Sequence, residues 1–195
     1  MEIHALACPF CAAPISQKER VCDYCGREYM ISSFSSLSKI DRSGLNKYTN
    51  AYSDALKSDP KDPALNRSIG ICYIKLGVYD KALNSFENLI ETDPEGSFGY
   101  YGAAISLLEG RSAFLSDKKR IDKAIKYMDA ALTIEEIGVY HYLMAYIKYE
   151  YYKRKYLKIE PDYNYHLEVA GSLHISDEDK RSLFEMLKVA PPKDF

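Results

Sequence analysis

The sequence repeats itself at a separation of 34 residues. The segment Ser58-Asp59-Pro60 returns as Thr92-Asp93-Pro94, and the aromatic residue before it, Tyr52, returns as Phe86. From residue 45 onward the apolar residues recur at helical spacing. A period of this length is typical of folds in which each repeat is a pair of helices that cannot bury its apolar face alone. Neighbouring repeats must therefore stack, and they give an elongated helical array.

One complete repeat lies between Pro60 and Pro94. Its characteristic positions hold Asn66, Ile69, Gly70, Tyr73, Ala82, Phe86 and Pro94. They resemble the tetratricopeptide-repeat (TPR) family, whose pattern is W-x2-L-G-x2-Y, then A-x3-F, then P. Asn66 departs from the usual Trp, and Ile69 departs from the usual Leu. The resemblance implies two antiparallel helices that approach closely at Gly70 and Ala82.

The flanking sequence follows the pattern less faithfully. A half repeat covers 45–60, and a second repeat contains an insertion of about eight residues near 110–120. A third repeat is expected to start near Val139, with Tyr142, Ala145, Tyr146 and Tyr149 on one face. We therefore predict a mostly α-helical fold, in which a short TPR-like antiparallel array (an α-solenoid) covers 45–160.

Four of the five cysteines form two C-x-x-C pairs near the N-terminus, Cys8 with Cys11 and Cys22 with Cys25. Zn²⁺ takes four ligands in a tetrahedron, and thiolates suit it. The segment resembles the short zinc-ribbon modules of many intracellular proteins, although its ten-residue spacer is short for them. We predict a zinc ribbon with a β-hairpin over 1–30 and a structural Zn²⁺ as cofactor. Iron in a rubredoxin-like site and a redox-active dithiol are the alternatives.

The remaining segments are assigned from composition. Six serines fall between Ser32 and Ser43, so 31–44 is expected to be a Ser-rich linker or a degenerate helix. Residues 161–195 are expected to form a C-terminal capping helix, starting near Ser176, and a tail. The alternative is that this helix fills the groove of the array. Cys72 is expected in the core, and the four histidines (His4, His141, His166 and His174) are scattered without a partner at metal or catalytic spacing.

The resemblance also implies a binding face. TPR ligands usually lie on the concave face, against residues of the first helix of each repeat. The corresponding residues here are Arg67, Ile71, Lys75, Phe98, Tyr101, Ile105, Tyr140, Leu143 and Ile147. The Lys/Asn set with which some family members clamp a C-terminal carboxylate is missing. The groove is apolar and aromatic, and such a surface is rarely left bare in water.

Charge and composition limit the classes of function that we expect for this chain. The net charge is −2, and no nucleophile–base pair, phosphate-binding glycine loop or paired carboxylates appear, so we do not expect an enzyme. No signal peptide or membrane-spanning run is visible, and we expect a soluble cytoplasmic protein. The main hypothesis is a non-catalytic adaptor that binds a protein or peptide through the concave face. The alternative is a nucleic-acid-associated regulator that uses the ribbon and two basic stretches, 118–126 and 148–158. In the second stretch tyrosines lie between the basic residues.

Overall fold

The computed structural model describes residues 6–15, 21–34, 40–193 and 195. Two short strands, β1 (Leu6–Ala7) and β2 (Pro14–Ile15), pair antiparallel, with Leu6 opposite Ile15. All the other elements are helical: α1 (Arg42–Leu56), α2 (Pro63–Leu76), α3 (Tyr79–Thr92), α4 (Ser97–Leu107), the short η2 (Ala113–Leu115), α5 (Lys118–Ile134), α6 (Gly138–Lys148) with its π-helical extension η3 (Tyr149–Lys153), α7 (Tyr163–Ser172) and α8 (Asp177–Leu187). The predicted mostly helical fold is confirmed.

The chain forms two compact units, Met1–Pro94 and Glu95–Phe195. The first holds the β-hairpin and α1–α3, and the second holds α4–α8. This division differs from the segments expected from composition, because the cysteine-rich N-terminus packs with the first helices. The serine-rich linker lies partly outside the described residues, at 35–39. None of the helices in the described part of the chain has both the length and the apolar character needed to cross a bilayer.

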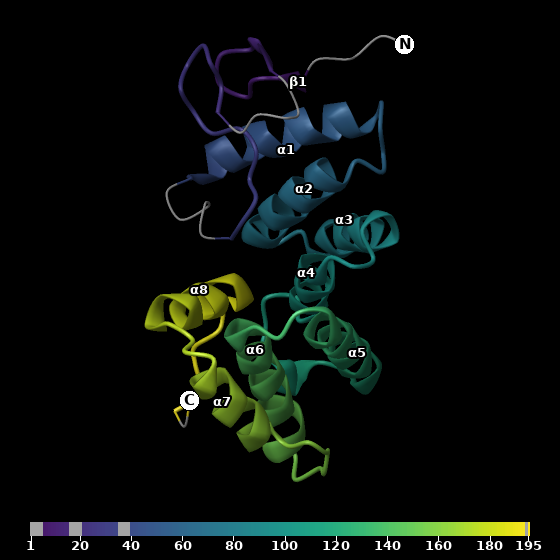
Figure 1. Cartoon of the computed structure of the whole chain (residues 1–195), viewed down its shortest axis with the longest axis vertical. Helices are drawn as coiled ribbons and strands as arrows, with labels where there is room; N and C mark the ends of the chain where they lie inside the picture. The colour runs from purple at the N-terminus through teal and green to yellow at the C-terminus, as the bar shows by residue number, and fades with distance from the viewer. Residues whose placement is uncertain (1–5, 16–20, 35–39, 194) are drawn as a thin grey trace. The chain divides into compact units, whose positions relative to one another are not determined.

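In the first unit, α2 and α3 form the complete repeat and lie side by side (Figure 1). Asp62 caps α2 by accepting a hydrogen bond from the Leu65 amide at 2.8 Å, and Gly77 ends the helix with a φ of 80°. Gly70 faces the ring of Phe86, and a Cβ at this position would lie 2.9 Å from Phe86 Cζ. The close approach that the sequence predicted at Gly70 is therefore confirmed.

Asn66, at the position of the usual Trp, ties the start of α2 to its surroundings. Its side-chain amide donates to the carbonyls of Pro60 and Asp62, both at 2.9 Å, and its oxygen accepts from the Asn88 side chain of α3 at 3.3 Å. Asn66 is 1% exposed, so these bonds replace water that the amide loses on burial. A polar contact between the helices thus stands where the family has an apolar one.

In the second unit, α4 pairs with α5, and α6 pairs with α7. Gly138, His141 and Lys148 of α6 face α7. A Cβ on Gly138 would meet Ile175 and Ala170. The side chains of His141 and Lys148 bond to His166 of α7. In the complete repeat, the matching face of α2 holds Asn66 and Gly70. The third repeat therefore begins at Gly138, one residue earlier than the sequence pattern suggested. Helix α6 is therefore rotated about its own axis, relative to the orientation that a start at Val139 predicts.

A chain of polar groups holds α7 on α6. His141 Nδ1 lies 3.0 Å from His166 Nδ1, and Lys148 Nζ lies 2.9 Å from His166 Nε2 and donates to the Pro161 carbonyl at 2.7 Å. All three side chains are buried. The expectation of scattered, unpaired histidines is wrong for His141 and His166. Their separation by 25 residues gave no local signal, because only the packing of α6 on α7 brings them together.

Candidate functional site

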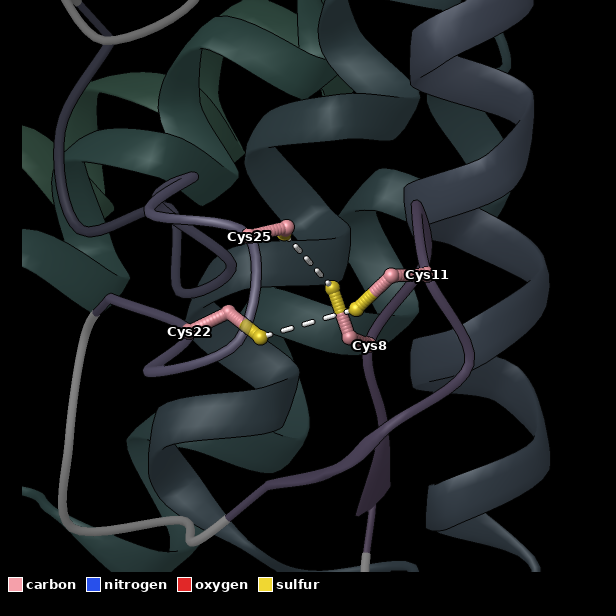
Figure 2. Close-up of side chains that lie close together, drawn as sticks. All are labelled: Cys8, Cys11, Cys22 and Cys25. Atoms are coloured by element: carbon pink, nitrogen blue, oxygen red, sulfur yellow. Dashed lines mark hydrogen bonds between the residues drawn. The ribbon is translucent and has the colours of Figure 1, made fainter.

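The four N-terminal cysteines converge on one point (Figure 2). All four sulfur atoms lie within 4.8 Å of one another. Cys8 Sγ is 3.7 Å from Cys25 Sγ, and Cys11 Sγ is 3.7 Å from Cys22 Sγ. Four thiolates bound to zinc at about 2.3 Å would be about 3.8 Å apart, because they occupy the corners of a tetrahedron. The cluster could therefore hold a metal ion such as zinc.

Two similar backbone turns present these sulfurs. In the first turn the Cys8 amide donates to Ala13 O at 2.8 Å, and in the second the Cys22 amide donates to Arg27 O at 2.9 Å. The residue after each pair has a positive φ, 59° at Ala12 and 67° at Gly26. Gly26 meets this need at little cost, because glycine has no Cβ. The two turns thus direct both cysteine pairs toward one point.

The backbone of the first turn also favours the thiolate. Burial raises the pKa of Cys8, but hydrogen bonds from the backbone amides of Phe10 and Cys11 and from neighbouring thiols outweigh it, so that the pKa is about 7. A thiolate is the form that ligates metal. Cys72, the fifth cysteine, lies apart in α2, where burial raises its pKa to about 12. Its predicted place in the core is confirmed.

The ribbon module, defined here as residues 6–34, is hydrogen-bonded to helix α1. The Tyr48 hydroxyl of α1 donates to the Glu28 carbonyl, and the Tyr52 hydroxyl donates to the Tyr29 carbonyl and accepts from the Ile31 amide at 3.2 Å. The Tyr48 ring also meets Phe10 edge-on, with ring centres 5.3 Å apart. The module that carries the cysteine cluster is therefore bonded directly to α1.

The nine residues predicted to contact a partner have two environments. Ile71, Ile105, Leu143 and Ile147 are at most 1% exposed, and Tyr101 and Tyr140 are 4% exposed. Arg67, Lys75 and Phe98 are half-buried, and Arg67 Nε donates to the Ser32 carbonyl of the ribbon module at 2.9 Å. The chain itself thus covers most of the predicted binding positions. Their role in partner binding stays a prediction.

The turned register of the third repeat changes which α6 side chains face the groove. The ring centres of Tyr101 and Tyr140 lie 4.7 Å apart, so Tyr140 faces the preceding repeat. The positions equivalent to the groove residues Tyr101 and Ile105 of α4 are instead Tyr142 and Tyr146, with Tyr149 one turn further along. The sequence pattern placed these three tyrosines on one face of the helix together with Ala145. Their pattern Y-x3-Y-x2-Y fits either face, so only the contacts with α7 distinguish the two.

The two basic stretches are adjacent in the second unit. Tyr152 donates to Asp122 at 3.2 Å, and the cationic groups of Arg154 and Lys155 lie 4.7 and 5.1 Å from the ring centre of Phe114. Carboxylates offset much of their charge: Lys118 pairs with Asp122 at 2.7 Å, Arg120 with Asp117 at 3.4 Å, and Arg154 with Glu150 at 2.6 Å. Such pairing weakens attraction to a phosphate backbone. The alternative of a nucleic-acid-associated regulator gains no support.

No model of a protein family matches the sequence, and no curated protein matches it. Solved structures match the fold. TTC0263, a thermophilic TPR protein of Thermus thermophilus, matches with a TM-score of 0.56 and 17% identity, over 74% of this chain and 73% of that one. The structure "MamA MSR-1 C2" matches with a TM-score of 0.51 and 20% identity, over 71% of this chain and 69% of that one. At these identities the likeness shows the fold alone, and that fold is TPR-like.

Proposed function

We propose that this protein is a non-catalytic interaction scaffold with a structural zinc site. The observation that supports the proposal is the TPR-like array, in which pairs of helices present a face lined by the first helix of each repeat. TPR-like proteins are typically scaffolds for protein partners. The partner we propose is a protein or peptide segment that contacts the first helices of one unit, either α2 in the first unit or α4 and α6 in the second.

The zinc site has a structural role in the scaffold and catalyses no reaction. Cys8, Cys11, Cys22 and Cys25 would hold the ion, and zinc with four thiolates has no open position for a substrate or an activated water. The ion would fix the two cysteine turns, which are too small to fold on an apolar core alone. The ordered ribbon then supplies the carbonyls that Tyr48 and Tyr52 of α1 bind.

The proposal is tested by affinity capture of the full chain followed by mass spectrometry. Lys75→Glu changes a half-buried groove position of α2, and we expect it to lower recovery of a specific partner at least about threefold. Lys119→Glu, at an exposed site on α5, is the matched control and should leave recovery unchanged. Recovery should also withstand high salt, since an apolar interface is screened little. A captured partner that both variants retain equally would refute the proposed face.

A further inference from the structure

One face of α6 is lined by aromatic rings. Three tyrosines lie on the side of α6 and its extension η3 that carries the predicted groove positions. They are Tyr142, Tyr146 and Tyr149, and we call them the tyrosine face. Tyr142 and Tyr146 are 5% and 1% exposed. Aromatic surface of this extent gains free energy when it is covered, so a native structure rarely leaves it in water.

The chain covers this face with its own C-terminal segment. Helix α8, which lies beside α6 in Figure 1, places Phe184 edge-on against Tyr142 and Tyr146, with ring centres 6.0 and 5.4 Å apart. Phe195 lies 5.4 Å from Tyr142 and 5.2 Å from Tyr149 by ring centres. Two phenylalanines thus occupy the tyrosine face.

The covering helix has the pattern of a helical ligand. Leu183, Phe184 and Leu187 are buried on one side of α8, and the first turn is acidic. Helix α8 therefore packs its apolar side on α6 in the way that a bound amphipathic helix lies in a groove.

Helix α8 is held to α6 by aromatic and aliphatic contacts. A pocket of about 570 Å³, open to the surface, lies beside α8 and is lined by Tyr142, Phe184, Val189 and Phe195 among others. In contrast, the buried chain of His141, His166 and Lys148 fastens α7 to α6. Of the two, α8 is the element that can leave without disrupting a buried polar network.

We infer that the tyrosine face is a binding site for an amphipathic partner helix with an aromatic anchor, and that α8 with Phe195 occupies this site in the free protein. The inference rests on the proposed function and specifies its partner. The anchor fills the place of Phe184, and two aliphatic residues, one just before it and one three residues after it, match Leu183 and Leu187. A partner helix binds by displacing α8. The resident α8 therefore lowers the apparent affinity of the partner for the tyrosine face.

The test uses the full chain and a labelled synthetic peptide with the sequence of residues 175–188. The double variant Phe184→Ala/Leu187→Ala removes the two anchors of α8 but leaves the tyrosine face intact. We expect the peptide to bind this variant at least about tenfold more tightly than the wild type, because the tethered competitor is weakened. Fluorescence anisotropy measures the affinity, and hydrogen exchange reports the opening of α8.

Matched controls make the result specific. Glu185→Ala alters an exposed residue of α8 and should keep the wild-type affinity. A peptide with alanine in place of its phenylalanine should not bind. If circular dichroism shows that the double variant loses helices beyond α8, the single variant Leu187→Ala replaces it.

Two results would overturn the inference: a folded variant with α8 open and peptide affinity within about twofold of the wild type, or a variant whose α8 stays protected from exchange. The peptide assay needs no natural partner. Its failure is therefore separate from a failure of the capture experiment, which concerns α2.

Discussion

At the scale of single residues, the four clustered cysteines differ from Cys72 in geometry, and Cys8 differs from it also in pKa. Their sulfurs converge within 4.8 Å, and backbone amides favour the thiolate of Cys8. Cys72 lies buried in α2 with a raised pKa. The first set is arranged to hold a metal ion, whereas Cys72 is a small apolar residue of the core.

Replacing one cysteine of the cluster should abolish metal binding. Cys25→Ser removes one of four thiolates, and we expect the metal content to fall from about one ion per chain to near zero. Elemental analysis measures this and also distinguishes zinc from iron. Cys72→Ala is the control and should retain the full metal content. A Cys25→Ser protein that keeps one ion per chain would contradict the assignment of the ligands.

The His141–His166–Lys148 chain should make stability depend on pH. Burial, together with the charge of Lys148 and the neighbouring His141, lowers the pKa of His166 to about 3, against about 6.5 in the unfolded chain. Below about pH 6.5 the unfolded state therefore binds more protons than the folded state. The free energy of unfolding must fall as the pH drops from about 6.5 toward 3, by up to about 1.4 kcal/mol per pH unit for one proton.

Urea unfolding between about pH 7.5 and about pH 4.5 measures this dependence. His166→Asn removes the titrating group, so its free energy of unfolding should change less with pH than that of the wild type, even if the variant is less stable throughout. His174→Gln alters an exposed histidine and should leave the wild-type dependence unchanged. Equal pH dependence in all three proteins would show that His166 does not titrate as described.

At the scale of helices, the pairing of α2 with α3 depends on the absence of a side chain at Gly70. Gly70→Ala would place a Cβ 2.9–3.1 Å from three atoms of the Phe86 ring. Overpacking of this kind costs about 1–3 kcal/mol, of which the better helix propensity of alanine offsets about 0.5–1 kcal/mol. We expect thermal or urea unfolding to show a net loss of about 1–2 kcal/mol.

Gly171 of α7 offers the matched control, because a Cβ there would meet nothing within 4 Å. Gly171→Ala should leave stability unchanged or raise it by up to about 1 kcal/mol. A second check combines Gly70→Ala with Phe86→Leu, whose smaller side chain leaves room for the new methyl group. The double variant should lose less stability than the sum of the single variants. Strict additivity would mean that the Phe86 ring is not what Gly70 accommodates.

The complete repeat could be predicted from the sequence because its signals are local. Gly70, Phe86 and Pro94 occur at fixed spacing, and each has a steric role within one helix pair. The third repeat could be located but not oriented. Between 138 and 152 nearly every residue is apolar or aromatic, so a register one residue away fits the pattern equally well. The buried polar groups of His141 and Lys148 settle the register, and their partner lies in α7.

At the scale of the whole chain, the two compact units should respond differently to loss of metal. The ribbon module shares its hydrogen bonds with Tyr48 and Tyr52 of α1, so disorder in the ribbon removes their partners. We expect a chelator to speed hydrogen exchange at residues 21–31 and along α1, and to leave α4–α7 unchanged. Exchange measured with and without metal tests this. A uniform increase over both units would mean that the metal stabilises the chain globally.

The candidate binding face shows where prediction from sequence ends. The apolar character of its positions could be predicted, since Ile71, Tyr101 and Ile105 lie in the clearly repeated helices. The C-terminal helix was one of two alternatives for its cover, but the individual contacts could not be predicted, because they join segments that are distant along the chain: Ser32 contacts Arg67, and Phe184 contacts Tyr142. No periodic pattern of residues in the sequence indicates such contacts. They follow only from the packing of complete helices.

The order of α6 and α8 along the chain has a consequence during protein synthesis. Translation proceeds from the N-terminus, so Tyr142, Tyr146 and Tyr149 are made before Phe184 and Phe195 exist. At about 5–20 residues per second, roughly 2–8 s separate the synthesis of Tyr149 from the end of α8. Until α8 has been made, Phe184 and Phe195 cannot cover the rings of these tyrosines. The nascent chain is therefore the state in which chaperones, or a partner helix already present in the cell, meet this face without competition.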